Sequence, residues 1–143
     1  IASSSCFGTN LANMDYCEIR FFSWTGTMRH IKREVQKMIM TLTATFSPGE
    51  KADVIRVLDS IIGPTTAQPG CLFCRLYSNV NNDDDMLFLE KWDSRETLEQ
   101  HIRSKEFRRI LAAMEMANER PDLSFITTSK KEGLEMVENI RGI

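Results

Sequence analysis

The sequence predicts an α+β domain of four strands and two helices, and three features carry this prediction. Residues 86–107 pass from an alternating apolar run directly into a helical pattern. Residues 38–62 make the same passage earlier in the chain. The 143 residues suit one domain with a single core. The resulting order of strand, helix, strand, strand, helix and strand is that of the ferredoxin-like fold, an antiparallel sheet with helices on one face.

The first strand and helix are expected within residues 38–62. Apolar residues alternate with threonines from Met40 to Phe46, which is the period of a strand. Residues 47–49, Ser-Pro-Gly, break that strand, and a stripe at helical spacing follows. The members of the stripe are Val54, Ile55, Leu58, Ile61 and Ile62. Gly63 and Pro64 are expected to end or kink this helix.

The second and third strands are expected at residues 71–80 and 86–92, joined by the polar loop 81–85. In the third strand Phe88, Glu90 and Trp92 share one face. Ser94 is a typical helix N-cap, and one helix is expected from there to Met114. Its apolar side is expected to carry Leu98, Ile102, Ile110, Leu111 and Met114, with His101 beside them.

The remaining chain divides into a fourth strand, residues 123–128, and a short helix over 133–140. We therefore expect three parts: an N-terminal extension at 1–37, the domain at 38–130, and a C-terminal helix and tail at 131–143. Within the extension, 16–24 suits a strand and 30–38 a short helix. Four strands leave one sheet face bare, so a homodimer is expected to cover it with a second sheet.

Composition narrows the classes of partner. The net charge is −2, and acidic and basic residues are interspersed, so nothing predicts a nucleic-acid surface. No apolar run approaches the length of a membrane span, and no secretory signal begins the chain, so a cytoplasmic protein is expected.

Cys71 and Cys74 form only half of a zinc motif, and residues three apart on a strand point to opposite faces. We interpret them as core residues, and Asp83–Asp85 as a solvated hairpin tip, so no metal is expected.

Residues 38 to about 130 resemble the antibiotic biosynthesis monooxygenase family, whose quinol monooxygenase-like members are dimeric α/β barrels. The resemblance rests on Pro48-Gly49 at the helix entry and on Pro69-Gly70-Cys71 before the second strand. It rests also on the run Glu90-x-Trp92-x-Ser94, followed by Leu98, His101, Ser104 and Phe107. It implies the ferredoxin-like fold, the dimer, and activity on a small molecule.

The resemblance also separates branches of the family. Haem-degrading members carry a histidine ligand four residues after the helix phenylalanine, and Leu111 stands there after Phe107. Their helix tryptophan matches His101, and their first-strand asparagine has no counterpart in residues 40–46. The histidine at 101 is what quinol monooxygenase-like members show. The resemblance therefore implies oxidation of a small phenolic, quinol or anthrone-type compound by dioxygen, with no cofactor.

The candidate site residues follow from residue type. His101 is the only histidine of the predicted domain and a suitable base, which could deprotonate a phenol. Trp92 could stack on an aromatic substrate, and Tyr77 or Arg75 could donate hydrogen bonds to an oxyanion. His101 and Trp92 also have purely structural interpretations, as a hydrogen-bonded core histidine and a packed tryptophan, and Tyr77 and Arg75 are chosen by residue type alone.

The sequence leaves the function class open. A non-catalytic small-molecule-binding or stress-related dimer fits the same fold, and an isomerase of a small oxygenated metabolite is a further alternative. A closed apolar pocket that receives His101 would favour the enzyme. A His101 side chain that bonds outward, or a pocket filled by Met and Phe side chains, would favour the binding protein.

Overall fold

A computed structural model of the chain describes residues 16–21, 29–34 and 36–142, with the first two segments described as backbone only. The chain divides into two compact units, Ile1–Val35 and Gln36–Ile143. In the first unit, β1 (Tyr16–Phe21) pairs antiparallel with β2 (Arg29–Glu34). The strand expected at 16–24 is confirmed over 16–21, and residues 22–24 lie outside the described residues. The helix expected at 30–38 is wrong, because β1 supplies the backbone partners of β2 and residues 37 and 38 already belong to the next strand.

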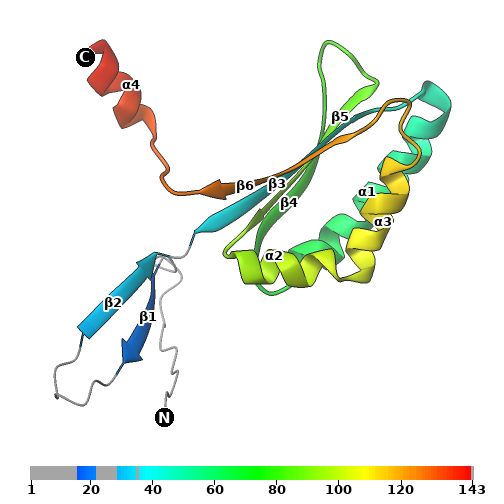
Figure 1. Cartoon of the computed structure of the whole chain (residues 1–143). Coiled ribbons are helices and arrows are strands. Elements are labelled where there is room, and N and C mark those ends of the chain that lie inside the picture. The colour runs from blue at the N-terminus through cyan, green and yellow to red at the C-terminus, as the bar shows by residue number, and fades with distance from the viewer. Residues whose placement is uncertain (1–15, 22–28, 35, 143) are drawn as a thin grey trace. The chain divides into compact units, whose positions relative to one another are not determined.

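The second unit has the predicted ferredoxin-like topology. Its four strands form one antiparallel sheet in the order β4-β5-β3-β6. The strands are β3 (Lys37–Thr45), β4 (Cys71–Ser78), β5 (Asp85–Trp92) and β6 (Asp122–Thr128). The helices that connect them are α1 (Pro48–Thr66), α2 (Arg95–Ile102) and α3 (Lys105–Met114). Figure 1 shows α1, α2 and α3 on the same face of this sheet.

Helix α1 begins at Pro48, where a missing N–H costs nothing, and buries Val54, Leu58 and Ile61 against the sheet. The expected end or kink at Gly63–Pro64 did not stop the helix, which continues to Thr66. A proline in the last turn removes only one hydrogen bond of the ladder, and the buried face of α1 extends past it to Thr65.

The single helix expected after Ser94 is two helices. Ser94 caps α2 by accepting from the N–H of Thr97 at 3.3 Å, and Ser104 caps α3 by accepting from the N–H of Phe107 at 3.3 Å. The second N-cap begins a new helix, so the positions that face the core no longer follow the spacing of α2. Ile102 and Leu111, expected in the core, are therefore 36% and 43% exposed. Leu98 and Ile110 are buried as predicted, together with His101, Glu106, Phe107 and Ala113.

The strand register decides what lies beneath the helices. Trp92 of β5 stands opposite Met38 of β3, Glu90 opposite Met40, and Phe88 opposite Leu42. All six side chains are buried, which places them on the face that the helices cover. The other face carries Thr41 opposite Leu89 and Thr43 opposite Leu87, which are partly or fully exposed.

The C-terminal helix α4 (Leu134–Arg141) confirms the predicted element and buries none of its residues. Its apolar side chains Leu134, Met136, Val137 and Ile140 are all exposed. Gly142, with φ of 66°, follows the helix in the left-handed conformation that glycine adopts readily. Among the described helices, none is long and apolar enough to cross a membrane.

Candidate functional site

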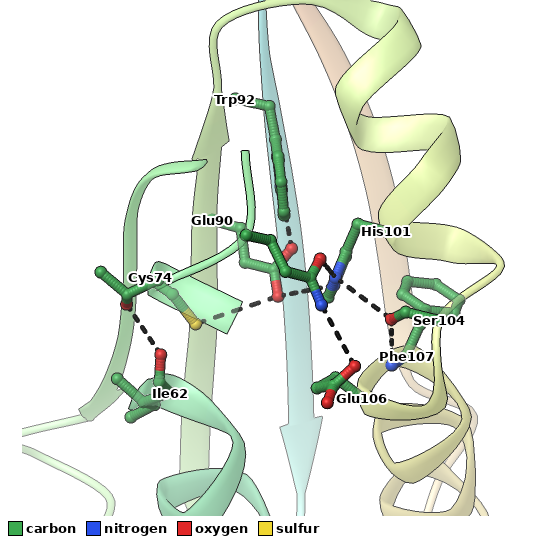
Figure 2. Close-up of polar contacts among 10 residues, drawn as sticks. Ile62, Cys74, Glu90, Trp92, His101, Ser104, Glu106 and Phe107 are labelled. Atoms are coloured by element: carbon green, nitrogen blue, oxygen red, sulfur yellow. Dashed lines mark hydrogen bonds and ion pairs between the residues drawn. The ribbon is translucent and has the colours of Figure 1, made fainter. Parts of the chain in front are cut away.

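His101 lies in the last turn of α2 and faces the sheet with only 1% of its surface exposed. Its ring stacks on Trp92, with ring centres 4.7 Å apart and planes 28° from parallel. The Phe107 ring meets it edge-on at 5.5 Å. The break between α2 and α3 produces this arrangement, because it brings residues 101 and 107 to the same buried face. Figure 2 shows His101 enclosed between the strand residues and α3.

Glu90 is the second ionisable group of the site and is fully buried. The two-residue period of β5 carries it to the helix-covered face between Phe88 and Trp92. Its Oε2 accepts a hydrogen bond from Trp92 Nε1 at 3.0 Å, and its Oε1 lies 3.2 Å from His101 Nε2. Nε2 makes no hydrogen bond with the described residues, so its contact with Glu90 is electrostatic. A buried carboxylate needs such partners, since an isolated buried charge is strongly unfavourable.

Gln68 connects His101 to α3. Its Oε1 lies 2.8 Å from His101 Nδ1, and its Nε2 donates to Glu106 Oε2 at 3.1 Å. Gln68 sits in the turn between α1 and β4, which is fixed by Gly70 with φ of 84°. The Gly70 carbonyl accepts from the N–H of Asp93 at 2.8 Å, which ties this turn to the end of β5.

Sequence reasoning missed Gln68 and Glu106. Gln68 lies in a predicted turn, and Glu106 in a helix rich in charged residues, so neither differs in type from surface residues around it. One signal was present: Glu106 adjoins Phe107 on the face of α3 that also carries Ile110 and Ala113. The contact between Gln68 and His101 spans 33 positions of the chain, and only the fold reveals it.

The positions of Cys71 and Cys74 differ from the prediction that they point to opposite faces of their strand. A register irregularity between Cys71 and Phe73 shifts β4, so that Cys71 stands opposite Trp92 and Cys74 opposite Glu90. Both thiols therefore belong to the helix-covered side, although their spacing predicted opposite faces. Both are free thiols. Burial, then the nearby Glu90 carboxylate, raises the pKa of Cys71 to about 11 and that of Cys74 further.

Arg75 and Tyr77 lie on the opposite face of the sheet from His101 and Trp92. Their register partners in β5 are Leu89 and Leu87, which alternate with the buried Glu90 and Phe88. The Arg75 guanidinium lies 5.3 Å from the centre of the Phe73 ring. The structure thus brings two of the four predicted site residues together and separates the other two. The functional role of each residue stays a prediction.

A cavity of about 540 Å³ lies at the other end of the sheet. Thr43, Tyr77, Asp85 and Arg120 are among the residues that line it. Asp85 pairs with Thr45 at the end of β3, seven positions along that strand from Met38, which stands opposite Trp92. At about 3.3 Å per residue, this cavity is roughly 20 Å from the His101 end. No group of three or more metal-binding side chains occurs within the described parts of the chain.

The chemistry available at His101 is proton transfer and stabilisation of an anion. Glu90 and His101 form a buried pair in which a proton can be held on either partner, and the adjacent Trp92 ring gives a flat surface. Buried ionisable pairs of this kind are typical of functional sites, although structural networks also contain them.

Comparison with known proteins places this geometry in a family. The sequence model of the antibiotic biosynthesis monooxygenase family matches residues 38–113. The uncharacterised protein sll1783 of Synechocystis is 29% identical over 76 residues, which are 53% of this chain. The chain spans about half of that relative, since the match covers 48% of it.

Solved structures share the fold. A conserved protein from Methanosarcina mazei Go1 superposes with a TM-score of 0.60 at 22% identity, over 64% of this chain and 92% of that protein. Rv0793 from Mycobacterium tuberculosis gives a TM-score of 0.61 at 18% identity, over 68% and 99%. PA3566 from Pseudomonas aeruginosa gives 0.58 at 21% identity, over 66% and 96%. The matched residues contain the whole network of Gln68, Glu90, His101 and Glu106, and the chain belongs to the antibiotic biosynthesis monooxygenase family.

Proposed function

We propose that this protein oxidises a small phenolic, quinol or anthrone-type compound with dioxygen, without a cofactor, beside His101. One observation carries the proposal: two ionisable side chains, Glu90 and His101, are fully buried in contact within a domain of this family. Neither is needed to fill an apolar core, and burying them is unfavourable unless they are paired. A proton-handling role explains why the layer between helices and sheet holds them.

The reaction needs little from the protein. A phenol that loses its hydroxyl proton, or an anthrone that loses a proton from its ring CH₂, becomes an electron-rich anion that reacts with dioxygen. For an anthrone, the ring CH₂ becomes a carbonyl: one oxygen atom enters the product, and the other leaves as water with the two hydrogens. The substrate supplies all the electrons, so the overall reaction balances without an external reductant. The protein must stabilise the anion and exclude bulk water.

For this reaction the substrate must reach the His101 ring from solvent. His101 is enclosed by Trp92, Phe107, Glu90 and Gln68. Of these, Gln68 is partly exposed and lies in a turn, so its displacement is the shortest route from solvent to the ring. We expect substrate to enter where Gln68 lies.

A homodimer is part of the proposal. The sheet face opposite the helices carries Ile39, Phe73 and Leu89, which are partly exposed in a single chain. A second copy that lays its own sheet against this face would cover them. Sedimentation analysis should show a dimer, and Leu89→Arg should shift it toward monomer. A wild-type protein that stays monomeric at tens of micromolar would contradict this part.

A second function is favoured by a separate observation. Both ring nitrogens of His101 face polar partners, and the cavity of about 540 Å³ lies at the other end of the sheet beside Tyr77. A non-catalytic dimer that binds a small molecule there fits these facts. It predicts ligand binding that Tyr77→Phe or Arg120→Ala weakens and His101→Gln leaves unchanged.

Oxygen uptake by the purified protein separates the two functions. Quinols, anthrones and catechols are offered to the wild type, to His101→Gln, and to Tyr77→Phe as the matched control from the other face. The oxygenase predicts uptake that His101→Gln lowers by about a hundredfold or more, the usual contribution of a proton-handling group. It predicts little change in Tyr77→Phe. No uptake with any compound, from a folded protein, would favour the binding function.

A further inference from the structure

The Gln68 side chain bridges two buried polar groups. Its Nε2 donates to Glu106 Oε2 at 3.1 Å, and its Oε1 lies 2.8 Å from His101 Nδ1. His101 is 1% exposed and Glu106 is 8% exposed, whereas Gln68 is only partly buried. A carboxylate only accepts hydrogen bonds, so the amide nitrogen faces Glu106 and the amide oxygen faces the ring. Because that oxygen also only accepts, Nδ1 carries a hydrogen and donates it.

The two buried groups therefore present one acceptor and one donor to whatever lies between them. Glu106 Oε2 accepts, and His101 Nδ1 donates. This arrangement is the same whether the proton between Glu90 and His101 Nε2 lies on the carboxylate or on the ring, because neither choice changes Nδ1. Ser104 Oγ lies 3.5 Å from Nδ1, farther away than the Gln68 oxygen. A molecule that displaces the amide must replace both of its hydrogen bonds, since buried polar groups left without partners are unfavourable.

The Gln68 side chain can leave this position while the turn that carries it stays folded. The backbone N–H of Gln68 donates to the Thr65 carbonyl at 3.0 Å, and its carbonyl accepts from the N–H of Cys71 at 3.2 Å. Neither contact involves the side chain. Rotation about the side-chain bonds therefore moves the amide into solvent, where water replaces its partners. It leaves an open polar position between Glu106 and His101.

We propose that the Gln68 amide occupies a ligand position, and that the ligand is an aromatic ring with two oxygens on neighbouring carbons, as in a catechol. One hydroxyl donates to Glu106 Oε2, and the neighbouring oxygen accepts from His101 Nδ1. The amide carries its donor and acceptor on one carbon, so its replacement must also carry them close together. In hydroquinone the two hydroxyls lie at opposite ends of the ring and cannot bridge the two groups. This inference rests on the proposed function and narrows its substrate class to vicinal diols.

The charges around Glu106 leave the required oxygen available. Lys105 Nζ lies 4.0 Å from Oε1 of Glu106, the oxygen that Gln68 does not use. Oε2 is bonded to the Gln68 amide, which the ligand displaces. Glu106 and His101 would thus contact the ligand oxygens directly. Gln68 fills the position only while no ligand is bound.

Calorimetric titration in the absence of dioxygen tests the spacing of the ligand oxygens, with catechol, resorcinol and hydroquinone as probes. These isomers share the same atoms and ring and differ only in where the hydroxyls stand. Gln68→Ala opens the position and should bind catechol about tenfold or more tightly than either isomer, the range for one hydrogen bond to a charged group. Catechol should also bind Gln68→Ala more tightly than the wild type, where it must displace the amide. Equal affinities for the three isomers in Gln68→Ala would overturn the inference.

Variants at Glu106 test the acceptor of the site. In the Gln68→Ala background, Glu106→Gln keeps an oxygen that accepts and should keep the preference for catechol. Glu106→Leu removes the acceptor and should abolish the preference. Glu99→Gln, which breaks an exposed pair with Arg95, is the matched control and should change no affinity. A preference that survives Glu106→Leu would contradict the role of Glu106.

NMR of the wild-type chain gives a second readout that needs no substitution in the site. Catechol should shift the Gln68 side-chain amide signals as it displaces them from Glu106 and His101, and hydroquinone should leave them unchanged. Catechol that binds without shifting these signals would overturn the inference.

This inference and the proposed function can fail separately. Oxygen uptake that depends on His101 and is as fast with hydroquinone as with catechol would keep the oxygenase and reject the position for vicinal oxygens. Selective binding of catechol, together with no oxygen uptake from any compound, would keep the position and reject the oxygenase.

Discussion

The buried pair of Glu90 and His101 makes a quantitative prediction about stability. Glu90→Leu removes the acceptor of the Trp92 N–H and the buried carboxylate that lies 3.2 Å from His101 Nε2. Removing one member of a buried pair costs about 3–5 kcal/mol. Since small domains are stable by only about 5–15 kcal/mol, this loss is a large part of the total. Urea unfolding followed by circular dichroism measures this loss of stability. The compared variants should show the same dependence of the unfolding free energy on urea concentration.

Two further variants make this prediction refutable. Combining Glu90→Leu with His101→Leu removes both members of the pair. It leaves the buried Trp92 N–H unpaired, at about 1–3 kcal/mol, and frees the partly exposed Gln68 side-chain oxygen for water. The double variant should therefore recover about 2 kcal/mol relative to Glu90→Leu. Glu99→Gln, which breaks an exposed pair with Arg95, should cost only about 0.5 kcal/mol. A loss below about 1 kcal/mol for Glu90→Leu would show that the buried contacts of Glu90 contribute no more than an exposed ion pair.

Three other predictions follow from local geometry. Gly70→Ala should destabilise the domain by more than about 1–2 kcal/mol in chemical denaturation, because φ is positive and an added Cβ would overlap the Thr97 side chain. Gly49→Ala, with open space around its Cα, should not destabilise it. Stability should fall as pH rises from the ordinary thiol pKa of 9.0 toward about 11, because the raised pKa of Cys71 lets the unfolded chain ionise first; Cys71→Ser should reduce this slope. Ser104→Ala should lower the melting temperature through a loss of about 1 kcal/mol, since it removes the cap of α3.

The sequence predicted the fold where hydrophobic periodicity is strong. The alternation in β5 placed Phe88, Glu90 and Trp92 on one face, and the structure confirms it. Periodicity did not reveal the break at Ser104, because one hydroxyl that caps a helix leaves the residue spacing almost unchanged. The same limit applies to Cys71, where a single irregularity in pairing reversed the face expected for the thiol.

The candidate site could be predicted only in part. His101 and Trp92 could be identified by residue type, and strand alternation placed Trp92 beside Glu90. Arg75 and Tyr77 were chosen by donor type alone, and the strand register put them on the other face. Gln68 could not be found from sequence, because its contact with His101 depends on how the turn at the end of α1 packs against α2.

The most direct test of where a small aromatic compound binds is an NMR titration of the labelled protein with a phenol that does not react with dioxygen. We expect the ring signals of His101, the Trp92 indole N–H and the Gln68 side-chain amide to shift together and to saturate at one dissociation constant. Shifts confined to Tyr77 and Ser78, beside the cavity at the other end of the sheet, would contradict it.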